Sequence, residues 1–204
     1  VLDCPDVDIL AGPCSYSDRR AGDPASFMSL VDTITAHGKL WFNEDDSRTS
    51  LLDPAYMREE WKAFNDPITH ADLDETLTVL DRNFTAIQQH RAGTWWMDLM
   101  AAGAFNHPQV GELLQRRVAG YRAELPTLEP YRPDVAVIVD ERSKQYIRSD
   151  WDANYLTMVK LRNAVGLATA RAGWYSLQDF AAGVVPPCRW YVFANAFCLD
   201  AEQR

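Results

Sequence analysis

The chain has 204 residues, 47% of them hydrophobic and 24% charged, and its formal net charge is −9. This length accommodates one sizeable domain or two small ones. The negative charge argues against a nucleic-acid backbone or an anionic membrane surface as partner, because both need a basic patch, and no apolar run approaches the roughly 18 residues of a membrane-spanning helix. We therefore expect no nucleic-acid or membrane partner, and the composition favours a neutral ligand such as a carbohydrate.

The first residues carry no basic region followed by an apolar core, so they do not resemble a signal peptide. Cys4, Cys14, Cys188 and Cys198 form no C-x-x-C pair, and the last three lie in apolar or aromatic surroundings. We expect them to be buried free thiols in a reducing, cytoplasmic setting. The histidines, at positions 37, 70, 90 and 107, lack metal-ligand spacing, and we predict neither a metal site nor a cofactor.

Short apolar runs alternate with longer helical patterns up to residue 125, as in α/β proteins. The helix predicted at 72–91 has apolar residues at three- and four-residue spacing and starts with Asp72 and Glu75, a pattern that resembles a capping box. The predicted strands of this part are 8–12, 39–43 and 94–99, and the predicted helices are 27–36, 54–61, 72–91 and 108–125.

Prolines then mark a linker at 126–133, which indicates a boundary between two domains, 1–125 and 134–204. The β-branched run at 135–139 is typical of a parallel strand buried on both faces. A helix is predicted at 154–172 and another strand at 190–194. Between the end of this helix and Ser176 only residues 173–175 remain, too few for a normal strand, so we expect the strand there to be vestigial or shortened. The fold class is α/β.

The strand at 39–43 is followed by Glu44-Asp45-Asp46, with Arg48 two residues later as the candidate cation that would favour ionisation of Glu44. Adjacent carboxylates repel one another, so strand stability does not explain the run. Paired carboxylates beside aromatic side chains are what cleavage of a glycosidic bond requires. The alternative is a solvated turn, in which Asp45 and Asp46 cap a helix or bind backbone amides and Glu44 forms an ordinary i, i+4 surface pair with Arg48.

Aromatic side chains near this run could form a sugar-binding platform. Trp41 precedes it, and Trp95 and Trp96 lie on the next predicted strand, where they must point to opposite faces. Core packing is the alternative for all three. Asp98 ends the same strand and could bind a sugar hydroxyl, while Tyr16 could hydrogen-bond a catalytic carboxylate or occupy a loop without a role.

These runs together resemble the (β/α)8-barrel glycoside hydrolases, most closely the family 42 β-galactosidases. The resemblance implies a partial (β/α) barrel segment followed by an incomplete flavodoxin-like (amidotransferase-like) unit. The similar runs are 8–13 with Tyr16 and Arg19 (sixth barrel strand and loop), 38–44 (seventh), 93–98 (eighth), and 133–141 and 189–197 (second domain).

By this resemblance Glu44 is the nucleophile of a retaining glycosidase for β-galactoside-like substrates. The residues implied around the sugar are Tyr16, Trp41, Arg48, Trp95 and Asp98. The general acid/base belongs to an earlier barrel strand that this sequence does not contain, so the proton donor is unidentified. The second domain mediates oligomerisation in that family, and the open edges of a partial barrel also need cover, so we expect a homo-oligomer.

A second hypothesis is a catalytically silent fragment that binds carbohydrate or only assembles. The two hypotheses differ in whether a second carboxyl group lies near Glu44 in the folded chain, because a retaining glycosidase needs two carboxyls about 5–5.5 Å apart.

Overall fold

The computed structural model describes residues 1–53, 55, 69–98, 101–148, 151–169, 171–201 and 203, with the backbone alone at 151 and 152. The short helix predicted at 54–61 lies outside these residues except at residue 55. The contacts divide the chain into two compact units, and each is described by itself. Unit 1 contains 1–10, 26–41 and 131–204, and unit 2 contains 11–25 and 42–130.

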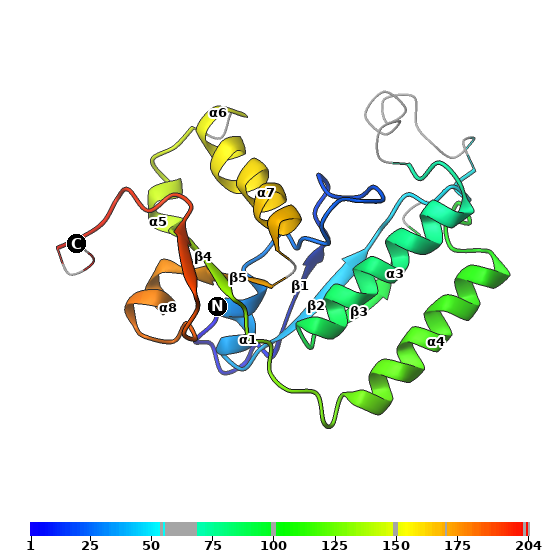
Figure 1. Ribbon diagram of the computed structural model, residues 1–204, viewed down its shortest axis with the longest axis horizontal. Helices are drawn as coiled ribbons and strands as arrows, with labels where there is room; N and C mark the ends of the chain where they lie inside the picture. Colours follow the sequence, from blue (N-terminus) through cyan, green and yellow to red (C-terminus); the bar gives the residue numbers. More distant parts are fainter. Residues whose placement is uncertain are drawn as a thin grey trace. The chain divides into compact units, whose positions relative to one another are not determined.

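The first sheet has three strands in the order β1-β2-β3, which is also their order in the chain (Figure 1). β2 and β3 run parallel, with Glu44 opposite Trp95 and Asp45 opposite Trp96. β2 continues past the predicted end of the strand, so that two of the three acids belong to the strand itself. The strands and the helices that follow them are β1 (Ile9–Pro13), α1 (Val31–Ala36), β2 (Leu40–Asp45), α3 (Leu73–Gln89), β3 (Gly93–Trp96) and α4 (Pro108–Glu124).

Unit 2 has its core between β3 and the helices α3 and α4, which lie alongside it in Figure 1. Leu80 of α3 and Val110 of α4 are fully buried there, and Trp96 packs against the cluster. α3 begins as its sequence indicates: the Asp72 carboxylate accepts the Glu75 amide at 2.8 Å, and the Glu75 carboxylate accepts the Ala71 amide at 2.6 Å. The capping pattern is therefore confirmed.

Unit 1 contains the second sheet, in the order β5-β4-β6 with all pairs parallel. The central strand β4 is the predicted β-branched run, and four of its five residues are buried. Its core side chains pack with those of β5 and α8. The elements of this part are β4 (Val135–Val139), α5 (Glu141–Lys144), α6 (Trp151–Asn154), a π-helical turn (Tyr155–Lys160), α7 (Leu161–Ala168), β5 (Ala172–Ser176), α8 (Leu177–Ala181) and β6 (Trp190–Phe193).

The prediction of a vestigial strand before residue 176 is wrong. The helix ends at Ala168, four residues earlier than expected, and β5 pairs with β4 along its whole length, from Ala172 to Ser176. Thr169 is extended, and its hydroxyl accepts the Arg171 amide at 3.0 Å. Such local side-chain bonds offer the backbone an alternative to the helix, which explains the early stop.

The α/β class is confirmed, with two small parallel sheets joined by helices. The helices in the described part of the chain are all too short or too polar to cross a membrane.

Candidate functional site

The candidate site lies at the end of β2 in unit 2, where strand alternation separates the consecutive acids. Along β2, Trp41, Asn43 and Asp45 are buried, while Phe42 and Glu44 on the other face are partly exposed. The carboxylates of Glu44 and Asp45 therefore point to opposite faces of the sheet.

Asp45 faces the core below α3 and is only 2% exposed. Its carboxylate accepts hydrogen bonds from the Ser47 amide and from the Asn83 side-chain amide, each at 3.1 Å. Asn83 also bonds the Ser47 hydroxyl at 3.3 Å. Asp45 thus fixes the turn after β2, which is the backbone-bonding role that the sequence left open.

Asp46 forms an ion pair with Arg19, from the loop after β1, at 2.5 Å. The Arg19 side chain is 1% exposed and also donates to the backbone carbonyls of Cys14, Ser15 and Asp46. Burial and the neighbouring acids, including Asp45 and Asp46, raise the pKa of the Cys14 thiol to about 12, although the Arg19 charge acts against this. The thiol therefore stays protonated. Through its ion pair and its bonds to carbonyls, Arg19 joins the loop after β1 to Asp46 at the end of β2.

Tyr16 lies over the same ion pair. The Arg19 guanidinium carbon is 4.1 Å from the centre of the Tyr16 ring, and the phenol donates to Asp46 at 3.3 Å. Burial and the charge of Asp46 raise the pKa of Tyr16, and Glu44 makes a smaller contribution in the same direction. The predicted tyrosine therefore lies beside the acids, but its hydrogen bond goes to Asp46.

A second layer of polar residues, which sequence reasoning did not single out, holds the loop that carries Tyr16 and Arg19. Arg82 of α3 donates to the carbonyls of Asp18, Arg20 and Asp23 at 2.6–3.0 Å. His70 is 3% exposed, and its Nε2 lies 3.2 Å from the Arg19 carbonyl. The sequence feature that could have indicated this layer is the presence of polar residues on the face of α3 that packs against the core.

The tautomer of His70 follows from its partners. A carbonyl accepts only, so Nε2 carries the proton and donates to Arg19, while Nδ1 accepts from the Thr76 hydroxyl at 3.2 Å. Burial lowers the pKa of His70, against the effect of the carbonyl bond, which keeps the ring neutral.

Arg48 differs from the other arginines around the site. Its backbone carbonyl accepts the His70 amide at 2.9 Å, which places it next to the Arg19 loop. Its Nη1 nitrogen is buried and has no hydrogen-bond partner among the described residues. Burial, followed by the charge of Arg19, lowers the pKa of Arg48, while Asp46 and Tyr16 act in the opposite direction.

The aromatic residues divide between the two faces of the sheet. Trp95 stacks on Phe42, with ring centres 4.9 Å apart, on the face that carries Glu44. Trp96 stacks on Phe84 of α3 in the core, at 6.1 Å. Trp41 is 2% exposed on the face opposite Glu44. Of the predicted platform, only Trp95 lies on the Glu44 face.

Asp98 is occupied by its own loop. One carboxylate oxygen accepts the Ala102 amide at 2.9 Å, and the other accepts the amides of Gly103 and Ala104 at 2.7 and 3.1 Å. These bonds hold the turn after β3. The structure thus places Tyr16 and Trp95 near Glu44, and Arg48 near Arg19, Asp46 and Tyr16. It gives Asp98 and Trp41 structural environments.

Glu44 itself accepts no side-chain hydrogen bond from the residues that the structure describes; its backbone carbonyl accepts the Cys14 amide at 3.1 Å. Partial burial and the charge of Asp46 raise the pKa of Glu44, and the Arg19 charge lowers it. Arg19 therefore takes the electrostatic role that the sequence assigned to Arg48.

The described residues bring no three His, Cys, Asp or Glu side chains together in a way that could hold a metal ion. Four cysteines are free thiols, of which Cys14 is buried and the other three are partly exposed.

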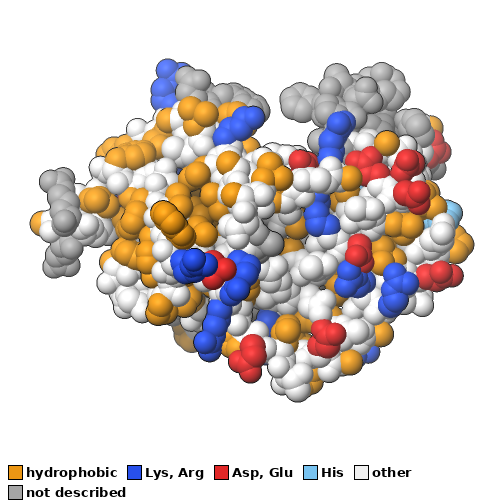
Figure 2. All heavy atoms as spheres, in the orientation of Figure 1, with side chains coloured by type: hydrophobic (Ala, Val, Ile, Leu, Met, Phe, Trp, Pro, Cys, Tyr) orange, Lys and Arg blue, Asp and Glu red, His pale blue; other side chains and the backbone are white. Residues whose placement is uncertain are grey.

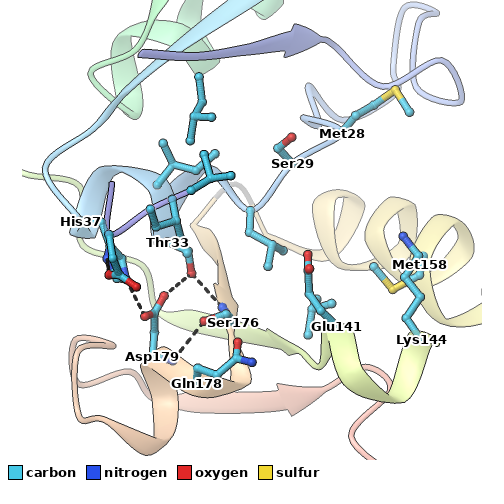
Figure 3. A pocket seen from close by; sticks show the side chains of 17 residues that line it. Met28, Ser29, Thr33, His37, Glu141, Lys144, Met158, Ser176, Gln178 and Asp179 are labelled. Carbon is cyan, nitrogen blue, oxygen red and sulfur yellow. Dashed lines mark hydrogen bonds and ion pairs between the residues drawn. The ribbon is translucent and has the colours of Figure 1, made fainter. Parts of the chain in front are cut away.

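A second polar cluster lines a cavity of about 760 Å³ within unit 1 (Figure 3). His37 Nε2 lies 2.8 Å from Asp179, and the Thr33 hydroxyl donates to the other Asp179 oxygen at 2.6 Å. Thr33 accepts the Ser176 amide at 2.8 Å, and Ser176 accepts the Asp179 amide at 3.0 Å. The hydroxyl proton points at the carboxylate and not at the imidazole, so the order differs from that of a catalytic triad. The network joins α1 to β5 and α8.

Comparison with protein-family models, with curated proteins and with solved structures finds no match for this chain. Its function is therefore inferred from the geometry of the site and from the residues that resemble the glycoside hydrolases.

Proposed function

We propose that the chain carries the nucleophile half of a retaining β-glycosidase site, with Glu44 as nucleophile and a β-galactoside-like sugar as substrate. The observation that carries this proposal is the free carboxylate of Glu44. It is the one acid of the run without a side-chain hydrogen bond to the described residues, whereas Asp45 and Asp46 hold the Ser47 amide and Arg19.

The surroundings of Glu44 support the same role. Trp95 lies beside it on the neighbouring strand and stacks on Phe42, which gives an apolar surface on the Glu44 face of the sheet. The ion pair between Arg19 and Asp46 supplies a fixed charge arrangement next to the carboxylate. Fixed dipoles and charges of this kind stabilise the charge that develops in a transition state.

The proton donor is the open part of the proposal. Asp46 is bound in an ion pair with Arg19, and Asp45 lies on the other face of the sheet, so neither is suited to donate a proton. Without a general acid among the described residues around Glu44, bond cleavage depends on the leaving group. The chain should therefore hydrolyse aryl glycosides with strongly acidic phenols, such as dinitrophenol, far faster than alkyl glycosides.

The test is hydrolysis of dinitrophenyl β-galactoside by the wild type, Glu44→Gln and the surface control Glu112→Gln. Loss of the nucleophile should lower kcat by roughly 10³-fold or more, and the control should retain full rate. Azide should rescue a Glu44→Ala variant and give the α-glycosyl azide, because azide then attacks from the face that Glu44 occupied.

A β-glycosyl azide would instead assign Glu44 as the general acid, the role that its raised pKa would suit. Equal turnover in wild type and Glu44→Gln would refute both roles.

The alternative of a silent carbohydrate-binding or oligomerisation fragment is favoured by the engagement of Asp46 with Arg19. It predicts no turnover in a folded protein, with binding of galactose still detectable by quenching of tryptophan fluorescence.

The remaining expectations also stay proposals: a homo-oligomer, a cytoplasmic setting for the free thiols, a partial barrel for the first sheet and a flavodoxin-like unit for the second.

A further inference from the structure

Arg48 is a partly buried cation without a counter-ion in the described part of the chain. Two other arginines of unit 2 show the contrast, since Arg19 pairs with Asp46 and Arg117 pairs with Asp81, each at 2.5 Å. The partly buried Arg82 forms no ion pair with a described carboxylate but donates to three backbone carbonyls. Buried polar groups in folded proteins are almost always hydrogen-bonded, and buried charges are paired. The buried Nη1 of Arg48 therefore requires an explanation.

The position of Arg48 is fixed by its neighbours in the chain. The Ser47 amide before it is bound to Asp45, and the Thr49 hydroxyl after it donates to the Ala104 carbonyl. The carbonyl of Arg48 accepts the His70 amide, and His70 in turn holds the Arg19 loop. These bonds hold the backbone on both sides of Arg48, so the point from which its side chain extends is fixed before a ligand binds.

The charges around Arg48 indicate which chemical group of a ligand it would bind. Asp46 is already taken by Arg19, and Tyr16 donates its proton to Asp46. Close to the ion pair that flanks Glu44, Arg48 is therefore a cation that forms no ion pair with a described carboxylate and whose buried Nη1 has no hydrogen-bond partner among the described residues. A guanidinium binds a carboxylate through two parallel hydrogen bonds.

We propose that Arg48 binds a carboxylate carried by the sugar, so that the substrates are β-uronides and not neutral β-galactosides. This inference rests on the proposed glycosidase function, since the sugar is identified through Glu44. It replaces the neutral ligand expected from the net charge of −9, which describes the whole chain and not this site.

The test compares two substrates that differ only at C6, an aryl β-galacturonide and the aryl β-galactoside. The wild type should show at least a tenfold higher kcat/KM for the uronide. Arg48→Gln should lower kcat/KM for the uronide about 100-fold more than for the galactoside, and Arg48→Lys should recover part of the difference. Arg116→Gln, on the exposed face of α4, is the matched control and should leave the ratio unchanged.

A wild-type enzyme that prefers the galactoside, or an Arg48→Gln variant that loses both activities equally, would overturn the proposal while leaving the glycosidase function intact. If neither substrate is hydrolysed, the glycosidase function fails, and calorimetry with free galacturonic acid and galactose tests Arg48 separately. Binding of the acid alone, lost in Arg48→Gln, would support recognition of the carboxylate by Arg48. Failure of the acid to bind would refute it.

Discussion

Glu44, Asp45 and Asp46 are adjacent in the chain, yet each meets different neighbours. Strand alternation sends Asp45 into the core, where amides hold it, and leaves Glu44 on the half-exposed face. Asp46, past the strand end, meets Arg19. Two of the acids are bound by donors in this way, and Glu44 has no side-chain hydrogen bond among the described residues. The repulsion that remains is seen in the pKa of Glu44, which burial and the charge of Asp46 raise.

The ion pair of Arg19 and Asp46 allows a test of whether burial determines how much an ion pair contributes to the stability of the fold. Arg117 and Asp81 have the same separation, 2.5 Å, but their side chains are 31% and 39% exposed, against 1% and 12% for Arg19 and Asp46. We expect Arg19→Met to lower the free energy of unfolding by about 3–5 kcal/mol, because it leaves a poorly hydrated carboxylate and three carbonyls without their donor. Arg117→Met should cost at most about 1 kcal/mol.

Denaturation with urea measures both variants against the wild type. The double variant of Arg19→Met with Asp46→Leu should recover part of the lost stability, since the stranded charge is then removed. Equal losses for Arg19→Met and Arg117→Met would show that burial does not determine the strength of these pairs.

The elements differ in how far the sequence specifies them. The run at 135–139 was predictable as a buried parallel strand because β-branched residues suit no other setting so well. The extent of β5 was not, because the helix before it ends through a local Thr169 bond whose effect on the backbone is weak in isolation. At the candidate site, the predicted end of β2 is two residues short of the observed end at Asp45, and the predicted end of β3 is three residues beyond the observed end at Trp96.

The polar layer of the site could not be predicted, for a different reason. Arg82 and His70 hold the loop after β1 across more than 50 residues of sequence, and a single sequence gives no pairing information at that range. Arg48 is near Glu44 in the sequence, whereas the cation whose charge acts on Glu44 in the folded chain is Arg19, 25 residues before it. Local patterns therefore gave the acids but not their partners.

The link that His70 makes between the loop and the first turn of α3 depends on pH. Burial lowers the pKa of His70 from its ordinary 6.5, so the unfolded chain binds the proton more readily than the folded one. The stability contributed by the neutral ring is present above pH 6.5 and is lost as the pH falls below that value toward the folded pKa. Protonation would also remove Nδ1 as acceptor for Thr76.

Urea denaturation between neutral and mildly acidic pH should therefore show a loss of stability in the wild type that is smaller in His70→Gln. His90→Gln, at the end of α3, serves as control and should keep the wild-type slope. A wild-type slope retained in His70→Gln would mean that another group governs this pH range and would contradict the prediction.

At the scale of the whole molecule, the two sheets share one weakness, because among the described residues each has three strands and therefore two unpaired edges. β6 is the more exposed example: Trp190, Tyr191 and Phe193 are 67%, 40% and 50% exposed. Figure 2 shows hydrophobic side chains gathered on the visible face of unit 1. A parallel strand is normally covered on both faces, and an aromatic edge strand is a template for pairing with another chain.

We therefore predict that β6 takes part in self-association. Lysines at an edge strand oppose pairing by their charge and hydration, so a variant with Trp190→Lys and Phe193→Lys should sediment as a monomer while the wild type sediments as a dimer or larger species. Tyr146→Lys removes a comparably exposed aromatic side chain, 71% exposed, outside the strands and should not alter the assembly. The far-ultraviolet circular dichroism of the variants establishes that they are folded. A wild type that is monomeric across the accessible concentration range would contradict the prediction. An unchanged assembly in the double variant would also contradict it, because β6 would then not be the contact between the copies.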